Sequence, residues 1–292
     1  MSMDEYLIDK RQIRRAFSRA STGYDAAAVL QREVCTRMLE RLDYIKLEPE
    51  RILDAGSGTG WGTRRLAQRY PAAQVIELDI AIGMLQTAQG RSGWWQKLFG
   101  GAKQLQVCAD VEALPLGGGS LEMVWSNLAL QWCNDLPATC VELHRVLKVE
   151  GLLMFSTFGP DTLKELRLAF NGVDQNNHLN RFADMHDIGD MLVQAGFADP
   201  VMDMEYITLT YDDVRGVLQD LKLIGAHNVT AGRSQGLMGK NAWARLIENY
   251  ERLRSNGKLP ATFEVVYGHA WKPQPRVTKD GAAIIKTSFK LK

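Results

Sequence analysis

The segment Asp54–Gly60 has the residue types and spacing of a ligand-binding loop. Its sequence, Asp-Ala-Gly-Ser-Gly-Thr-Gly, follows a short apolar run and precedes a stretch with helical character. Glycine lets the backbone turn tightly and approach a ligand where a Cβ atom would collide with it. Amide groups at the start of a helix attract an anionic group such as a carboxylate. The residues predicted to hold a ligand here are Asp54, Gly56, Ser57, Gly58 and Gly60.

Acidic residues also end the next two predicted strands. Asp79 ends the second strand, where a carboxylate can accept hydrogen bonds from both hydroxyls of a ribose. Asp110 directly follows the third strand, in a position to bind an adenine amino group. The neighbouring Ile80 and Val111 are predicted to line the same site. A dinucleotide site would also place an acid at Asp79, but a carboxylate at Asp54 would repel a pyrophosphate.

The loop and the two later acids together resemble the class I S-adenosylmethionine-dependent methyltransferases. This resemblance implies S-adenosylmethionine as the cofactor and S-adenosylhomocysteine as its product. A purely structural interpretation of each acid stays open: Asp54 would cap a helix, and Asp79 would pair with a surface lysine. Three acids at successive strand ends favour the cofactor site.

Strands and helices alternate through the first half of the chain. This pattern predicts an α/β fold: a Rossmann-like, doubly wound, seven-stranded and mostly parallel sheet, with the ligand at the carboxyl ends of the strands. The predicted strands of this region are 51–54, 74–79, 104–109, 121–126 and 152–157, and the intervening helices are 60–70, 81–89 and 136–147.

The flanking segments complete a single predicted methyltransferase domain over residues 1–292. Two N-terminal helices, broken by a turn-like cluster at 21–25, and helices after the fifth strand are expected to form a lid. The last strand, 261–270, alternates in polarity and is predicted to be an antiparallel edge. The predicted segments are an N-terminal lid (1–48), a cofactor-binding core (49–157), helical insertions with strand six (158–260), and the last strand and tail (261–292).

The composition is that of an ordinary globular protein. The 292 residues carry a formal net charge of +1, with 46% apolar and 24% charged residues. Nothing global therefore points to nucleic acid as a partner. No apolar stretch has the length of a membrane-spanning helix, and the early acidic residues do not fit a secretory signal.

The cysteines predict neither a metal site nor a disulfide. Cys35, Cys108, Cys133 and Cys140 include no Cys-x-x-Cys pair and no histidine at ligand spacing. Cys108 and Cys133 adjoin apolar runs, which favours reduced cysteines in or near the core. This usage suits the cytoplasm, the predicted location, and no metal is expected.

Several longer segments carry a more specific resemblance. WSNLALQWCNDL and STFGPDTLKELR are the most distinctive, and RFADMHDIGDMLVQAGF adds to them. From about Arg15 to Thr210 the chain resembles the malonyl-[acyl-carrier protein] O-methyltransferase family of biotin synthesis. The resemblance implies methylation of the free carboxylate of malonyl-acyl-carrier protein, or of malonyl-CoA, to a methyl ester. The Asn/Asp-Pro-Pro-Tyr pattern of amino-group methylases is absent from the fourth-strand junction.

Residues that meet the acceptor are predicted less firmly than those for the cofactor. Arg181 is the first candidate to hold the substrate carboxylate, ahead of Arg167 and Arg145, because a guanidinium forms paired hydrogen bonds with it. A structural salt bridge is the favoured role of Arg145. Tyr24 could close over the methyl group and donate its hydroxyl, or only pack in the lid. Position alone adds three residues near the reacting methyl: Asn127, Gln131 and Trp132.

An acidic carrier protein would dock on a basic face. Arg11, Arg14 and Arg15 share one side of the first predicted helix, although a solvated helix face would look the same. The insertion around Trp94–Trp95 departs from the family pattern and either meets a partner or packs on its own domain.

Other functions stay open. One is methylation of another small carboxylic acid or of a quinone. Another is a methyltransferase-fold assembly factor or protein-arginine hydroxylase, since that family shares the region from Arg181 onward. A protein that binds the cofactor without catalysis is a further possibility.

Overall fold

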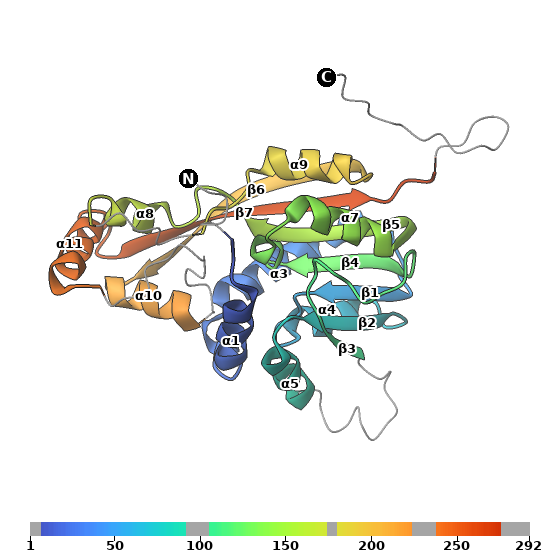
Figure 1. Cartoon of the computed structure of the whole chain (residues 1–292), viewed down its shortest axis with the longest axis horizontal. Helices are drawn as coiled ribbons and strands as arrows, with labels where there is room; N and C mark the ends of the chain where they lie inside the picture. The colour runs from blue at the N-terminus through green and yellow to red at the C-terminus, as the bar shows by residue number, and fades with distance from the viewer. Residues whose placement is uncertain (1–6, 92–104, 174–179, 224–237, 276–292) are drawn as a thin grey trace.

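The computed structural model describes residues 7–91, 105–173, 180–223 and 238–275 (Figure 1). Within these residues, strands join in one seven-stranded sheet of order β3-β2-β1-β4-β5-β7-β6. The first five strands pair in parallel, and β7 runs antiparallel to both of its neighbours. The predicted Rossmann-like, mostly parallel sheet is therefore confirmed.

The first four strands begin and end within one residue of their predicted positions, whereas the fifth begins at Leu147, five residues earlier than predicted. Their order reverses between β1 and β4, and a ligand crevice opens at such a reversal, beyond the carboxyl ends of the strands. The bounds are β1 (Arg51–Ala55), β2 (Gln74–Asp79), β3 (Leu105–Cys108), β4 (Leu121–Asn127) and β5 (Leu147–Phe158).

Helices cover both faces of this sheet. Neighbouring residues of a strand point to opposite faces, so Ile52 packs into one apolar core and Leu53 into the other. The first core includes α3 (Val29–Arg41) and α4 (Trp61–Arg69), and the second includes α7 and α9. The remaining bounds are α5 (Ile82–Arg91), α7 (Leu136–Val146) and α9 (Met185–Gln194).

The N-terminal helices lie against the carboxyl ends of the strands (Figure 1). Asp9 caps α1 (Lys10–Ala20) by accepting hydrogen bonds from the amides of Arg11 and Gln12. The predicted break is a turn, after which α2 (Tyr24–Ala27) begins. A single 3-10 turn, η2 (Leu42–Tyr44), follows α3.

The last strand is antiparallel as predicted, but its expected place at the sheet edge is wrong. β7 (Leu259–Trp271) lies between β5 and β6 (Ala198–Tyr211), and β6 forms the edge. Polar residues of β7 are buried because they have protein partners. Glu264, for example, is 5% exposed and accepts a hydrogen bond from the amide of Asp161 at 2.7 Å.

The long β6–β7 pair extends beyond the parallel strands and carries three helices at its far end (Figure 1). These are α8 (Lys164–Phe170), α10 (Val214–Leu223) and α11 (Lys240–Glu251). Their apolar side chains belong to the same core as α3. The two ends of the sheet therefore share one continuous apolar layer.

Within the described ranges, no helix is long and apolar enough to cross a membrane. Cys35 and Cys140 are buried and Cys133 is partly buried, as expected of core thiols. The prediction for Cys108 is wrong, because this residue is exposed on β3, the opposite edge of the sheet. The Trp94–Trp95 insertion lies outside the described residues.

Close packing at Gly268 of β7 gives a stability prediction. A Cβ atom at this position would lie 2.3 Å from Cζ of Phe155, its partner on β5. Gly268→Ala should therefore lower the free energy of unfolding by about 1 to 3 kcal/mol, measured by urea denaturation. Gly117→Ala is the matched control, because nothing lies within 4 Å of its added Cβ. Equal stability of the two variants would contradict this packing.

Candidate active site

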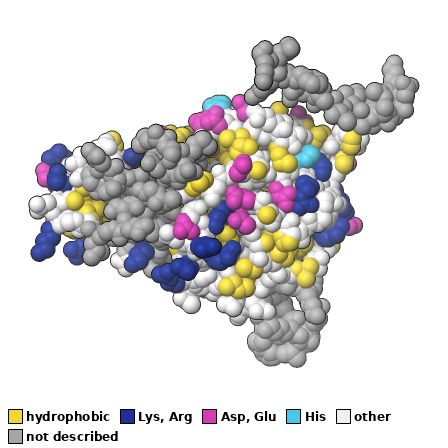
Figure 2. Space-filling model, in the orientation of Figure 1, with side chains coloured by type: hydrophobic (Ala, Val, Ile, Leu, Met, Phe, Trp, Pro, Cys, Tyr) yellow, Lys and Arg dark blue, Asp and Glu magenta, His cyan; other side chains and the backbone are white. Residues whose placement is uncertain are grey.

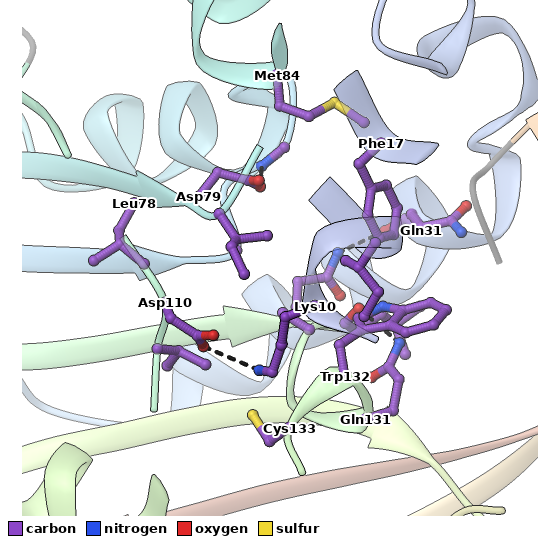
Figure 3. Close-up of a pocket in the computed structure, with 18 of the residues that line it drawn as sticks. Lys10, Phe17, Gln31, Leu78, Asp79, Met84, Asp110, Gln131, Trp132 and Cys133 are labelled. Carbon is purple, nitrogen blue, oxygen red and sulfur yellow. Dashed lines mark hydrogen bonds and ion pairs between the residues drawn. The ribbon is translucent and has the colours of Figure 1, made fainter. Parts of the chain in front are cut away.

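A pocket of about 820 Å³, open to solvent, lies between the N-terminal helices and the carboxyl ends of the strands. Figure 3 shows side chains from α1, α3 and the ends of β2 and β4 converging on it. Ten predicted site residues line it: Tyr24, Gly56, Gly58, Asp79, Ile80, Asp110, Val111, Asn127, Gln131 and Trp132.

A second pocket, of about 470 Å³, adjoins the first and shares Tyr24, Gly56 and Gly58 with it. Asp54 and Ser57 line this second pocket. Two predicted residues line neither pocket. Gly60 instead begins α4 with φ +74°, and Arg181 is exposed just before α9, so its contact with a substrate stays a prediction.

The loop after β1 needs glycine at two positions for different reasons. Gly56 has φ +84°, and a Cβ atom there would lie 2.3 Å from Cβ of Ala129. Gly58 has φ +55°, and its added Cβ would meet only the ring of Tyr24, at 4.0 Å. Gly56 therefore permits tight packing under the loop, whereas Gly58 leaves backbone open to a ligand.

Two buried carboxylates face this loop. Asp54 accepts a hydrogen bond from the Thr63 hydroxyl at 2.7 Å, and Asp79 accepts one from the Gly58 amide at 3.0 Å. Burial, with Glu77 and Asp79 nearby, raises the pKa of Asp54 to about 7. Burial likewise raises the pKa of Asp79 to about 6, although backbone amides oppose the shift. Neither acid has an ion pair within the described residues, so the site favours a ligand with positive charge.

Three buried polar atoms in the second pocket have no hydrogen-bond partner among the described residues. They are Oε1 of Gln31, Oγ of Ser57 and Nε1 of Trp125. Gln31 Oε1 and the Asp54 carboxylate can accept from an ammonium group, while Trp125 and Ser57 can donate to a carboxylate. This donor set fits the amino-acid end of S-adenosylmethionine, because buried polar groups otherwise have partners.

The larger pocket suits the nucleoside end of the same ligand. Asp79 lines it while accepting hydrogen bonds from the amides of Gly58 and Ala81, and Asp110 lies across the pocket just after β3 (Figure 3). Asp110 is paired in an unpredicted way: Lys10 Nζ lies 3.1 Å from its carboxylate and 2.9 Å from that of Glu112. The first helix is thereby tied to the rim of the pocket.

A hydrogen-bonded junction after β4 forms part of the pocket wall. Asn127 Nδ2 donates to the backbone carbonyl of Gln31 at 2.9 Å, and the Ser156 hydroxyl donates to Asn127 Oδ1 at 2.9 Å. Gln131 Nε2 donates to the Leu128 carbonyl at 2.7 Å. The side chains of Asn127 and Gln131 are therefore fixed before any ligand arrives.

Aromatic rings cover the pocket from the lid side. Phe17 of α1 contacts Trp132 edge to face at 5.5 Å and Tyr24 at 6.4 Å, measured between ring centroids. Burial and the nearby Asp79 raise the pKa of Tyr24, so its hydroxyl stays protonated and can donate a hydrogen bond. Such rings exclude water from the groups beneath them.

The sequence did not single out Lys10, Phe17, Gln31 or Trp125 for the site. Position at the strand ends identified most of the predicted lining residues, but these four come from helices or from the interior of a strand. The amphipathic pattern of the first helix was the available signal for two of them. Arg145 forms the predicted salt bridge, 2.7 Å from Glu142, and Arg167 donates to the carbonyl of Pro160.

Comparison with known proteins identifies the class. The methyltransferase-domain family matches residues 53–155, which hold the glycine loop and most of strands β1 to β5. The fold is similar to that of the YcgJ protein of Bacillus subtilis, with a TM-score of 0.58 over 83% of this chain and 99% of that one, at 16% identity. The chain is an S-adenosylmethionine-dependent methyltransferase.

Two curated relatives define the family within this class. The malonyl-[acyl-carrier protein] O-methyltransferase of Gallionella capsiferriformans is 81% identical over 99% of this chain and 100% of its own length. The malonyl-[acyl-carrier protein] O-methyltransferase of Nitrosospira multiformis is 61% identical over 94% of this chain and 92% of its own length. The chain belongs to the malonyl-[acyl-carrier protein] O-methyltransferase family, which confirms the resemblance seen in the sequence and does not favour the alternatives.

The buried carboxylates give a prediction for cofactor binding. Protonation of Asp54 removes the charge that attracts an ammonium group, so the Kd for S-adenosylmethionine should rise as the pH falls through about 7. We expect a weakening of about 10-fold or more between pH 7.5 and pH 5.5, measured by calorimetry. Asp54→Asn, as the control, should bind weakly and keep only the smaller pH dependence that Asp79, with its pKa of about 6, contributes. A Kd that is equal at both pH values would contradict the role of Asp54.

Proposed function

We propose that the protein transfers the methyl group of S-adenosylmethionine to the free carboxylate of a malonyl thioester on acyl-carrier protein. The product is a malonyl methyl ester for biotin synthesis. The 81% identity with a malonyl-[acyl-carrier protein] O-methyltransferase, over essentially the whole of both chains, carries this proposal. S-adenosylmethionine, when bound, supplies a methyl group on a positively charged sulfur.

The chemistry suits a site without a general base. A carboxyl group with a pKa of about 4 is already ionised at pH 7, so no proton has to leave the acceptor. The new bond joins a carboxylate oxygen to the methyl carbon while the carbon–sulfur bond breaks and its electron pair stays on sulfur. The reaction therefore needs no metal and no nucleic-acid partner, and we propose that it takes place in the cytoplasm.

The residues of this chain then act by binding, alignment and exclusion of water. Asp54 and Ser57 hold the amino-acid end of the cofactor, with Gly56, Gly58 and Gly60 shaping the loop. Asp79 and Ile80 bind the ribose end, and Asp110 and Val111 the adenine. The rate gain follows from alignment of oxygen, methyl carbon and sulfur in a dry pocket, since opposite charges neutralise each other in the transition state.

On the acceptor side, Lys10 is the one cationic side chain among the described residues that line the larger pocket. Its two carboxylate partners leave it poorly placed to bind a third carboxylate. We therefore assign the orientation of the malonyl carboxylate first to the Tyr24 hydroxyl, with Gln131 and Trp132 beside it. Arg181 contacts the acceptor in this proposal only after its side chain turns toward the pocket.

The segments of the chain have different tasks in the proposed reaction. The core (49–157) holds the cofactor, and the lid (1–48) encloses it. The helical insertions with strand six (158–260) and the last strand with the tail (261–292) support the acceptor end. Phe158, at the end of β5, lines the pocket and belongs to the same apolar core as residues of the β6–β7 pair, which supports a role for that pair on the acceptor side.

The direct test mixes the purified protein with methyl-labelled S-adenosylmethionine and one of three acceptors: malonyl-acyl-carrier protein, malonyl-CoA or free malonate. We expect base-labile label on the malonyl-carrier protein, well above that on free malonate, because the carrier adds recognition. Binding of the cofactor without transfer to any of the three acceptors would refute the proposed function.

A variant of Tyr24 tests the orientation of the acceptor. Tyr24→Phe keeps the ring that packs against Phe17 but removes the hydroxyl. A hydrogen bond to a charged group is worth about 1.5 to 3 kcal/mol, so kcat should fall roughly 10- to 100-fold. The Kd for S-adenosylmethionine and the Tm should hardly change. An unchanged kcat would remove the hydroxyl from the reaction and leave Tyr24 as a packing residue.

A further inference from the structure

The first helix has two faces with different surroundings. Lys10, Ile13 and Phe17 follow the three- and four-residue spacing of one helix face, and all three line the cofactor pocket. Ile13 is only 1% exposed. This inner face is thus part of the site itself, and the helix is no wider than about 10 Å with its side chains. A molecule bound to the outer face lies one helix away from the pocket.

The outer face of α1 is basic and exposed. It consists of Arg11, Arg14, Arg15 and Arg19, none of which forms an ion pair within the described residues. Figure 2 shows Lys and Arg side chains gathered over the part of the molecule where α1 lies in Figure 1. The helix contains no acidic residue.

This arrangement opposes helix stability. Arg11 and Arg15, and Arg15 and Arg19, are like charges four residues apart, and such pairs destabilise a helix. No described carboxylate forms an ion pair with these arginines, although Arg19 is favourably placed in the last turn of the helix. A surface that keeps uncompensated charge of one sign is suited to attract a partner of the opposite sign.

The basic face is held in a fixed position relative to the pocket. Asn134, just after η3 (Leu130–Trp132), donates to the carbonyl of Ile8 at 3.0 Å and accepts from its amide at 2.7 Å. Lys10 adds its ion pairs with Asp110 and Glu112. On the other side, a Cβ on Gly83 of α5 would lie 2.9 Å from the Ser18 carbonyl, so the two helices pack closely.

We propose that the outer face of α1, made by Arg11, Arg14, Arg15 and Arg19, is the surface on which the acidic carrier protein docks. The inference rests on the proposed function, because that function delivers the malonyl group on a carrier. Complementary charge speeds the encounter and fixes orientation more than it adds affinity. The tethered thioester then reaches the pocket around the edge of the same helix.

The test compares two substrates that share one thioester. Malonyl-carrier protein carries the acidic surface, whereas malonyl-pantetheine carries the thioester alone. The variant Arg14→Glu with Arg15→Glu reverses two charges on the docking face. The matched control, Lys240→Glu with Arg245→Glu, reverses two exposed charges of α11 that form no ion pair within the described residues, at the far end of the molecule (Figure 1).

We expect the α1 variant to lose about 10-fold or more in kcat/KM with malonyl-carrier protein and less than 2-fold with malonyl-pantetheine. The loss should be greatest at low salt, because exposed charges are screened as ionic strength rises. The α11 control should change neither value by more than 2-fold, and the Kd for S-adenosylmethionine should be the same in all three proteins.

Other outcomes separate failure of this inference from failure of the proposed function. If the α1 variant keeps its activity on the carrier substrate, or loses it equally on both substrates, the docking surface is wrong while the methyl transfer stands. An equal loss in the α11 control would also overturn it, since general charge rather than the α1 face would then decide. If the unchanged protein methylates neither thioester, the proposed function fails and the docking proposal fails with it.

Discussion

The burial of two carboxylates at the ends of neighbouring strands is the constraint around which the site is arranged. Asp54 and Asp79 lie beneath the glycine loop, each 8% exposed or less. Uncompensated burial of a charge is costly, so each receives hydrogen bonds from the chain: from Thr63 of α4, and from Gly58 of the loop. The loop conformation and the start of α4 are thus set by the same groups that await the cofactor.

The buried negative charge of Asp54 and Asp79 accounts for a preference for a positively charged ligand better than the shape of the pocket does. Both acids have a raised pKa because burial disfavours their charged forms. A ligand that brings an ammonium group and a sulfonium relieves the burial instead of adding to it. The same dry surroundings then favour a reaction in which charge disappears. Binding and catalysis are accordingly both expected to draw on one property of the site, the burial of its carboxylates beneath the glycine loop.

The sequence predicted the parallel half of the fold and the position of the glycine loop after β1 well, because both depend on local signals. Apolar runs of strand length and the order of glycines and acids leave little freedom in where β1, β2 and β4 end. The place of β7 was missed because alternating polarity is the same in an edge strand and in an inner strand whose polar side chains have partners. Glu264 has such a partner, the amide of Asp161, more than a hundred residues earlier in the chain.

The lid residues were likewise difficult to predict from local sequence signals. Tyr24 was predicted because it is an aromatic residue in an expected turn. Lys10, Phe17 and Gln31 lie in helical segments in which no local pattern distinguishes them. Their role depends on where α1 and α3 pack, and that is decided by contacts with Asp110, Trp132 and Asn127 from distant segments. Arg181 was chosen for its chemistry, but no periodicity in its segment indicates which way its side chain points.

The position of β7 has a consequence for how the protein is made. Because β7 lies between β5 and β6 but follows both in the sequence, both strands must wait for it. Until then β5 has one unpaired edge, and β6, whose partner in the described sheet is β7, has both edges unpaired. The cofactor-binding strands can assemble earlier, since their partners are close in sequence. Unpaired strand edges invite pairing with other chains. The nascent protein therefore passes through an interval in which its first half is folded while its sheet is still open, and its exposure to aggregation ends only with the final strand.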